Sequence, residues 1–250
     1  MKTDTAAWLR RAQPLLGTLV EIGVRGSGQA GHAALEAAFE AVHEVQASLS
    51  RFEAGSDVAR FNTLQSGERL TMRPSTQHVL TAAHELGMAS NGAFDISLGS
   101  APEGWRCDGD QLHKLAAAVQ LDLGGIGKGH AVDCAVQALL AHGCTNGWVN
   151  AGGDLRAFGD TDLPLRLRDE TSGGVRPFAS LRDGAFATSH FGRQSRSSLA
   201  CDPRAGRLPA HVSVAAPLCL WADALTKVVA VSGDTSHPLL ARFGACAWLH

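Results

Sequence analysis

Residues 121–154 read LDLGGIGKGHAVDCAVQALLAHGCTNGWVNAGGD: a short apolar run, a glycine cluster around Lys128, and then a helical pattern. Apolar side chains recur at helical spacing over residues 131–140, so we predict a helix that starts directly after the cluster. Glycine lets the backbone approach a bulky anion, and a helix N-terminus offers unpaired N–H groups and the positive end of its dipole. Lys128 adds a full positive charge at the same place. The segment therefore predicts a site for a phosphate or a pyrophosphate.

Neither of the two common nucleotide fingerprints fits this segment, because the glycines match neither the P-loop nor the G-x-G-x-x-G spacing. The alternative is a glycine-rich turn with a solvated lysine. Two flanking acids, Asp122 and Asp154, favour the ligand site. Asp122 lies in an apolar strand and either contacts the ligand or caps the glycine turn. Asp154 follows a second glycine turn, and we expect it to close that turn by bonds to its own backbone.

Composition excludes several classes of protein. The chain has 250 residues, of which 45% are hydrophobic and 18% charged, as in a globular domain. Its net charge is −2 and it has no run of Lys or Arg, which argues against a nucleic-acid or anionic-membrane partner. No apolar stretch approaches the length of a membrane span, and the N-terminus has neither an apolar signal region nor a lipoprotein-type cysteine. Six scattered cysteines without metal spacing are typical of reduced thiols, so we expect a cytoplasmic protein.

Periodicity elsewhere predicts early helices and later strands, an α+β class. Helices are expected over residues 30–49, 57–61, 74–91 and 222–231. A loop of undefined structure is expected to run from 94 to 110. Strands are expected over residues 15–24, 148–150, 165–168, 178–181, 185–188, 212–216 and 245–249.

Several short motifs, in this order and spacing, resemble the ApbE-like family, the FAD:protein FMN transferases. They are spread over most of the chain: LGT (16–18), LSRF (49–52) with Ser56, Asp57 and Asn62, GAFD (92–95), DLGGIGKG (122–129) with AVD (131–133), VNAGGD (149–154), ATS (187–189), DPRAG (202–206) and ADAL (222–225). The resemblance implies a two-lobed α+β fold with a ligand cleft between the lobes, and residues 1–250 as one domain. It also implies that FAD is split at its pyrophosphate. FMN then passes to a Thr or Ser hydroxyl of a target flavoprotein, and AMP is released.

The same resemblance implies roles for individual residues. Asp122 and Lys128 would contact FAD, and Asp223 would join Lys128 in catalysis. A magnesium ion beside the pyrophosphate would be held by the carbonyl of Gly125 and the carboxylate of Asp223. The flavin or adenine ring would be lined by Leu16, Phe52, Ala93, Phe94 and Asp95.

Two positions depart from the family pattern. Leu199 stands where the family has a histidine that is thought to help catalysis, and Lys227 stands where it has a threonine that binds the metal. Residues four apart are neighbours on a helix, so we predict that Lys227 pairs with Asp223 and weakens magnesium binding. Transfer would then be slow or absent. The alternatives to a transferase are an FAD-binding protein without transferase activity and an FAD pyrophosphatase.

Overall fold

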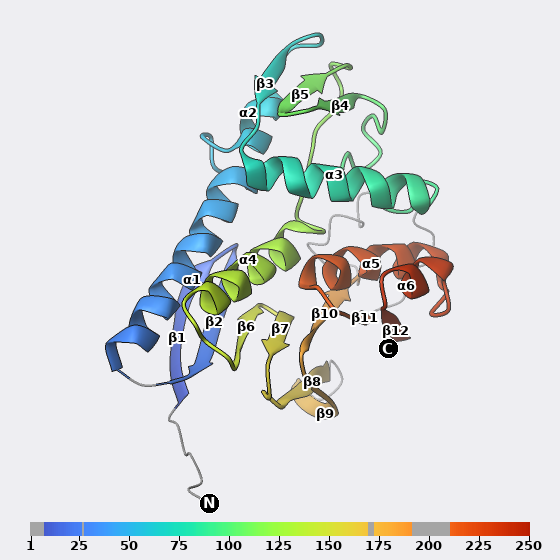
Figure 1. Cartoon of the computed structure of the whole chain (residues 1–250). Helices are drawn as coiled ribbons and strands as arrows, with labels where there is room; N and C mark the ends of the chain where they lie inside the picture. Colours follow the sequence, from blue (N-terminus) through green and yellow to red (C-terminus); the bar gives the residue numbers. More distant parts are fainter. Residues whose placement is uncertain (1–7, 27, 170–172, 192–210) are drawn as a thin grey trace, which may run out of the picture.

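An antiparallel sheet of seven strands forms the base of the molecule (Figure 1). The computed structural model describes residues 8–26, 28–169, 173–191 and 211–250. In spatial order, the strands are β1 (Trp8–Leu15), β2 (Thr18–Arg25), β6 (Gly147–Ala151), β7 (Asp154–Phe158), β10 (Gly184–His190), β11 (His211–Ala216) and β12 (Cys246–Leu249).

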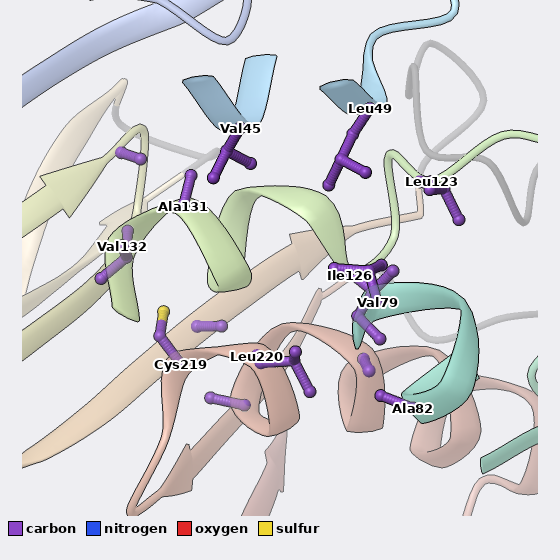
Figure 2. Close-up of a cluster of buried hydrophobic side chains, with 14 of the residues drawn as sticks. Val45, Leu49, Val79, Ala82, Leu123, Ile126, Ala131, Val132, Cys219 and Leu220 are labelled. Carbon is purple, nitrogen blue, oxygen red and sulfur yellow. The ribbon is translucent and has the colours of Figure 1, made fainter. Parts of the chain in front are cut away.

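Three helices, α1 (Gly28–Leu49), α4 (Gly127–Ala141) and α5 (Cys219–Ser232), pack against this sheet. Each buries an apolar stripe at helical spacing. The first half of α4 lies between the other two, as Figure 2 shows: Val45 of α1 packs on one side, and Leu220 of α5 on the other. The start of α4 is therefore in the interior of the molecule.

A smaller layer lies above α4 and α5 in Figure 1. It consists of α2 (Asp57–Thr63), α3 (Pro74–Ala89) and a three-stranded sheet of β3 (Arg69–Thr71), β5 (Gln111–Lys114) and β4 (Trp105–Asp108). A separate hairpin of β8 (Leu163–Asp169) and β9 (Gly174–Leu181), and the short helix α6 (Pro238–Arg242), complete the described elements. Buried side chains of both layers form one continuous core. The predicted α+β class is confirmed, and the single domain over residues 1–250 stays a prediction.

The predicted helices are present, but one predicted strand and one predicted loop differ from the structure. The segment 15–24 spans a hairpin turn, and the strand before that turn, β1, was missed because Arg10 and Arg11 interrupt its apolar pattern. The loop expected over 94–110 contains β4, a strand of four residues that is too short to show a period. Within the described part of the chain, no helix is long and apolar enough to cross a membrane.

Helices α4 and α5 cap each other at their N-termini. The Asp133 carboxylate of α4 accepts hydrogen bonds from the N–H groups of Cys219 (3.0 Å) and Leu220 (2.8 Å) in the first turn of α5. In return, the Asp223 carboxylate of α5 accepts one from the N–H of Gly129 (3.2 Å) in the first turn of α4. Backbone N–H groups that have no acceptor within their own helix are thus paired with a carboxylate of the other helix. We call this contact between the first turns of α4 and α5 the joint. The two positive helix ends are fixed beside each other.

Gly129 makes this joint possible. A Cβ atom at this position would lie 2.3 Å from the carbonyl oxygen of Cys219, which is backbone and cannot move aside alone. Gly152, in the second glycine turn, likewise leaves room for Thr18 of β2. Internal packing therefore requires glycine at both of these positions in the predicted phosphate segment, which the sequence pattern did not reveal.

Candidate functional site

A cavity of about 330 Å³ opens where the C-terminal end of α1, the β1–β2 turn and the loop before α4 meet. Its size is at the lower end of the range for small-molecule pockets. Four residues predicted to contact FAD come together here: Leu16, Phe52, Asp122 and Lys128. Apolar side chains such as Leu49 provide most of the remaining wall, and the cavity is also lined by the charged side chains of Arg51 and Glu53.

Leu16 is held at the cavity in an uncommon backbone conformation. Its φ is +56°, and that of Gly17 is +70°, as in the tight two-residue turns that connect antiparallel strands. A non-glycine residue in this region is strained and requires support from its surroundings. The Leu16 N–H donates to Oε1 of Gln46 (2.6 Å), whose Nε2 in turn donates to Oε1 of Glu53 (2.5 Å). A polar relay on α1 and the following loop thus fixes the residue on the cavity wall.

The rim of the cavity carries an exposed aromatic ring. Phe52 is 83% exposed, and the guanidinium of Arg51 lies 4.6 Å from its ring centroid. The Nε of Arg51 is also 3.3 Å from Oδ2 of Asp122, and Oδ1 of Asp122 accepts the N–H of Gly124 at 2.8 Å. Asp122 therefore caps the glycine turn, which confirms one alternative, and it also lines the cavity; its contact with a ligand stays a prediction. A free aromatic face at the rim suits a planar ring ligand.

Behind the cavity lies a buried cluster of four charged side chains. Lys128 pairs with Asp154, and Nζ of Lys227 lies 2.5 Å from Oδ1 of Asp223. Both carboxylates are fully buried, and the Lys227 side chain is only 6% exposed. The Lys128 side chain is 33% exposed and also lines the cavity. Lys128 is therefore the member of the cluster that connects it to the cavity.

The charges in this cluster shift one another's titration. Burial raises the pKa of Asp154 to about 6, and the neighbouring Asp223 adds to this rise. Burial also acts to raise the pKa of Asp223, but the ammonium groups of Lys128 and Lys227 outweigh it and lower that pKa. Burial acts to lower the pKa of Lys128, and the two carboxylates outweigh it and raise that pKa. Lys128 and Asp223 thus remain charged at neutral pH.

The prediction that Asp154 closes its own turn was wrong. In the structure Asn150 does so, because its Oδ1 accepts the N–H of Gly153 at 2.9 Å. Asp154 begins β7, points into the core and pairs with Lys128. The sequence carried one signal for this pair: Lys128 is the only Lys or Arg within residues 121–154. A buried carboxylate needs a cation, and the nearer candidate, Arg156, pairs with Asp133 in the structure.

Other predicted site residues lie away from the cavity. The ring of Phe94 is buried in the core, and Asp95 caps its own turn by accepting the N–H groups of Ser97 (2.8 Å) and Gly99 (2.9 Å). Phe94 and Asp95 line a different cavity, whereas Ala93 lines neither. Their segment still contacts the site, since the N–H of Asp122 donates to the carbonyl of Ile96 at 2.8 Å.

The two predicted magnesium ligands, Gly125 and Asp223, do not line the cavity. Asp223 joins the site through the charge cluster and through the N–H of Gly129. Its predicted pairing with Lys227 is confirmed. Leu199 lies outside the described residues.

Comparison with known proteins shows the family of this chain. The sequence model of the ApbE family matches residues 16–116 and 105–247. The chain belongs to the ApbE family. It is 30% identical over 295 residues to a protein of Treponema pallidum (strain Nichols) named FAD:protein FMN transferase, covering 93% of this chain and 81% of that protein. A protein of the same name from Rhodobacter capsulatus is 29% identical over 274 residues, and the match spans 91% of this chain and about half (52%) of that protein.

The fold agrees with solved ApbE structures. The flavin transferase ApbE from Vibrio cholerae superposes with a TM-score of 0.83 at 19% identity, covering 98% of this chain and 93% of that one. At this identity the likeness shows the shared fold. The two-layer arrangement is thus the fold of the ApbE structures.

Proposed function

We propose that this protein is an FAD:protein FMN transferase that uses the cavity beside Lys128 to bind FAD. The observation that carries the proposal is the position of Lys128, which lies in the first turn of α4 and lines a cavity with apolar walls and an exposed aromatic rim. A dinucleotide needs both features, an apolar surface for a ring and a cationic helix end for the pyrophosphate. Membership of the ApbE family and the name of the relative from Treponema pallidum support the same activity.

In the proposed reaction, a Thr or Ser hydroxyl of an acceptor flavoprotein attacks the phosphorus of the FMN half of FAD. The new P–O bond forms as the bond to the bridging oxygen breaks. AMP leaves with that oxygen, and the hydroxyl proton is released. The protein's part is to hold the pyrophosphate and to neutralise its oxygens, since phosphoryl transfer depends mainly on positioning and electrostatics. Lys128 lines the cavity, which supports this role, and the positive end of the α4 dipole lies beside it.

The donor atoms do not fit the magnesium ion that the family resemblance implies. Of the two Asp223 oxygens, Oδ1 contacts the Lys227 ammonium and Oδ2 accepts the N–H of Gly129. The hydroxyl of Thr226 donates to the carbonyl oxygen of Asp223 (2.6 Å). At an effective dielectric constant near 20, a divalent ion about 4 Å from an ammonium is repelled by about 8 kcal/mol. We therefore derive no step through a metal ion.

One incubation separates this function from its alternatives. Purified protein is mixed with FAD and a flavoprotein that carries a flavinylation motif, and the acceptor mass and free nucleotides are measured. A transferase adds FMN to the acceptor and releases AMP in equal amount. A pyrophosphatase releases both FMN and AMP into solution, and a binding protein releases neither.

The cytoplasm is the location that we propose for this activity, because the scattered cysteines of the sequence are typical of reduced thiols.

A further inference from the structure

Lys227 is locked inside the charge cluster. Its Nζ donates to Oδ1 of Asp223 (2.5 Å), to the carbonyl oxygen of Asp223 (3.0 Å) and to Oγ of Ser189 (3.1 Å). These three bonds use all the donors of an ammonium group. The side chain is 6% exposed, so turning the charge outward to water would deprive the buried Asp223 of its direct ion-pair partner.

The cluster is already neutral without any added ion. Lys128 and Lys227 supply two positive charges, and Asp154 and Asp223 supply two negative ones. A metal ion at Asp223 would have to displace the ammonium of Lys227 or lie against it. Magnesium prefers oxygen ligands in an octahedral arrangement, and at Asp223 the nearest charged neighbour is a nitrogen cation.

We propose that Lys227 is a built-in cation of this site, which neutralises Asp223 permanently so that the pyrophosphate of FAD binds without a divalent ion. This rests on the proposed function, because it concerns the same ligand and the same cavity. Lys227 stays with Asp223, so Lys128, which pairs with Asp154, is the lysine of the cluster that also lines the cavity. Lys128 lines the cavity together with Arg51, and the positive end of the α4 dipole lies beside Lys128.

The ion dependence of FAD affinity tests the proposal in the unmodified protein. FAD is titrated by flavin fluorescence once with EDTA and once with millimolar magnesium. We expect the two dissociation constants to agree within about threefold. A larger loss of affinity in EDTA overturns the proposal. If FAD fails to bind under both conditions, the proposed function is wrong, and the ion question is then answered by titrating the FAD-free protein with Mn²⁺ and recording its electron paramagnetic resonance.

Variants at position 227 make the Mn²⁺ test sharper. The unmodified protein should not bind Mn²⁺, whereas Lys227→Thr should create a site and make FAD affinity depend on the ion by about tenfold or more. Lys227→Arg keeps the charge and should behave like the unmodified protein. Lys114→Met is the matched control, because Lys114 is also buried but lies in β5, outside the cluster. Mn²⁺ binding by the unmodified protein as tight as that of Lys227→Thr would contradict the proposal.

Discussion

A single lysine connects the cavity to the charged interior. Lys128 pairs with the buried Asp154 and also lines the cavity where we place FAD. Its removal has two consequences: the ligand loses a cation, and Asp154 loses its partner. Each effect acts through charge, so the affinity for FAD, which carries a pyrophosphate, should fall more than the affinity for a flavin without phosphate.

Lys128→Ala should therefore weaken FAD binding by about tenfold to a hundredfold, the loss expected when one hydrogen bond to a charged group is removed. The affinity for riboflavin, which has no phosphate, should change much less. Fluorescence titrations of both ligands with both proteins measure this. An equal loss for FAD and riboflavin would indicate that the substitution disturbs the cavity and that Lys128 does not contact the pyrophosphate.

Asp154 predicts a specific dependence of stability on pH. Its pKa in the fold is raised to about 6, above the unfolded value, so the stability it contributes is present at low pH and lost as the pH rises through 6. Asp154→Asn removes this loss. Relative to the unmodified protein, the variant should gain up to about 3 kcal/mol in free energy of unfolding between about pH 4 and pH 8. Urea unfolding at each pH measures the difference in stability between the two proteins. A difference that is constant or falls with pH would show that the pKa of Asp154 is not raised in the fold.

At the scale of elements, the joint between α4 and α5 positions the site. Asp133 and Asp223 cap the two helix starts across the joint, and Gly129 allows the two helices to be in contact. Lys128 belongs to the first turn of α4, and Asp223 follows directly after the first turn of α5. The charge cluster therefore depends on the approach of the two helices.

Gly129→Ala tests this joint. Alanine is the better helix former by about 1 kcal/mol, so an isolated helix would gain stability. Here the new methyl group would meet the Cys219 carbonyl at 2.3 Å, and we expect a net loss of about 2 kcal/mol or more in free energy of unfolding. Gly55→Ala is the control, since a Cβ there meets nothing within 4 Å. A variant as stable as the control would mean that the helices separate without cost.

At the scale of the whole molecule, the sequence predicted what repeats locally. Helices α1, α4 and α5 were found from their apolar period, and Leu16, Phe52, Asp122 and Lys128 were grouped through the family resemblance. What the sequence did not reveal depends on long-range pairing. The partner of Lys128 lies 26 residues away, and the Cys219 and Leu220 N–H groups that donate to Asp133 lie more than 80 residues away. Short edge strands such as β4 have no period to read.

The central claim is that the cavity at the C-terminal end of α1 binds FAD through Lys128, in the first turn of α4. The measurement that tests it most directly is a flavin fluorescence titration of the unmodified protein with FAD. We predict saturable binding with a dissociation constant in the micromolar range or tighter. A titration that shows no saturation, in a protein whose thermal unfolding is cooperative, would contradict the assignment of the cavity.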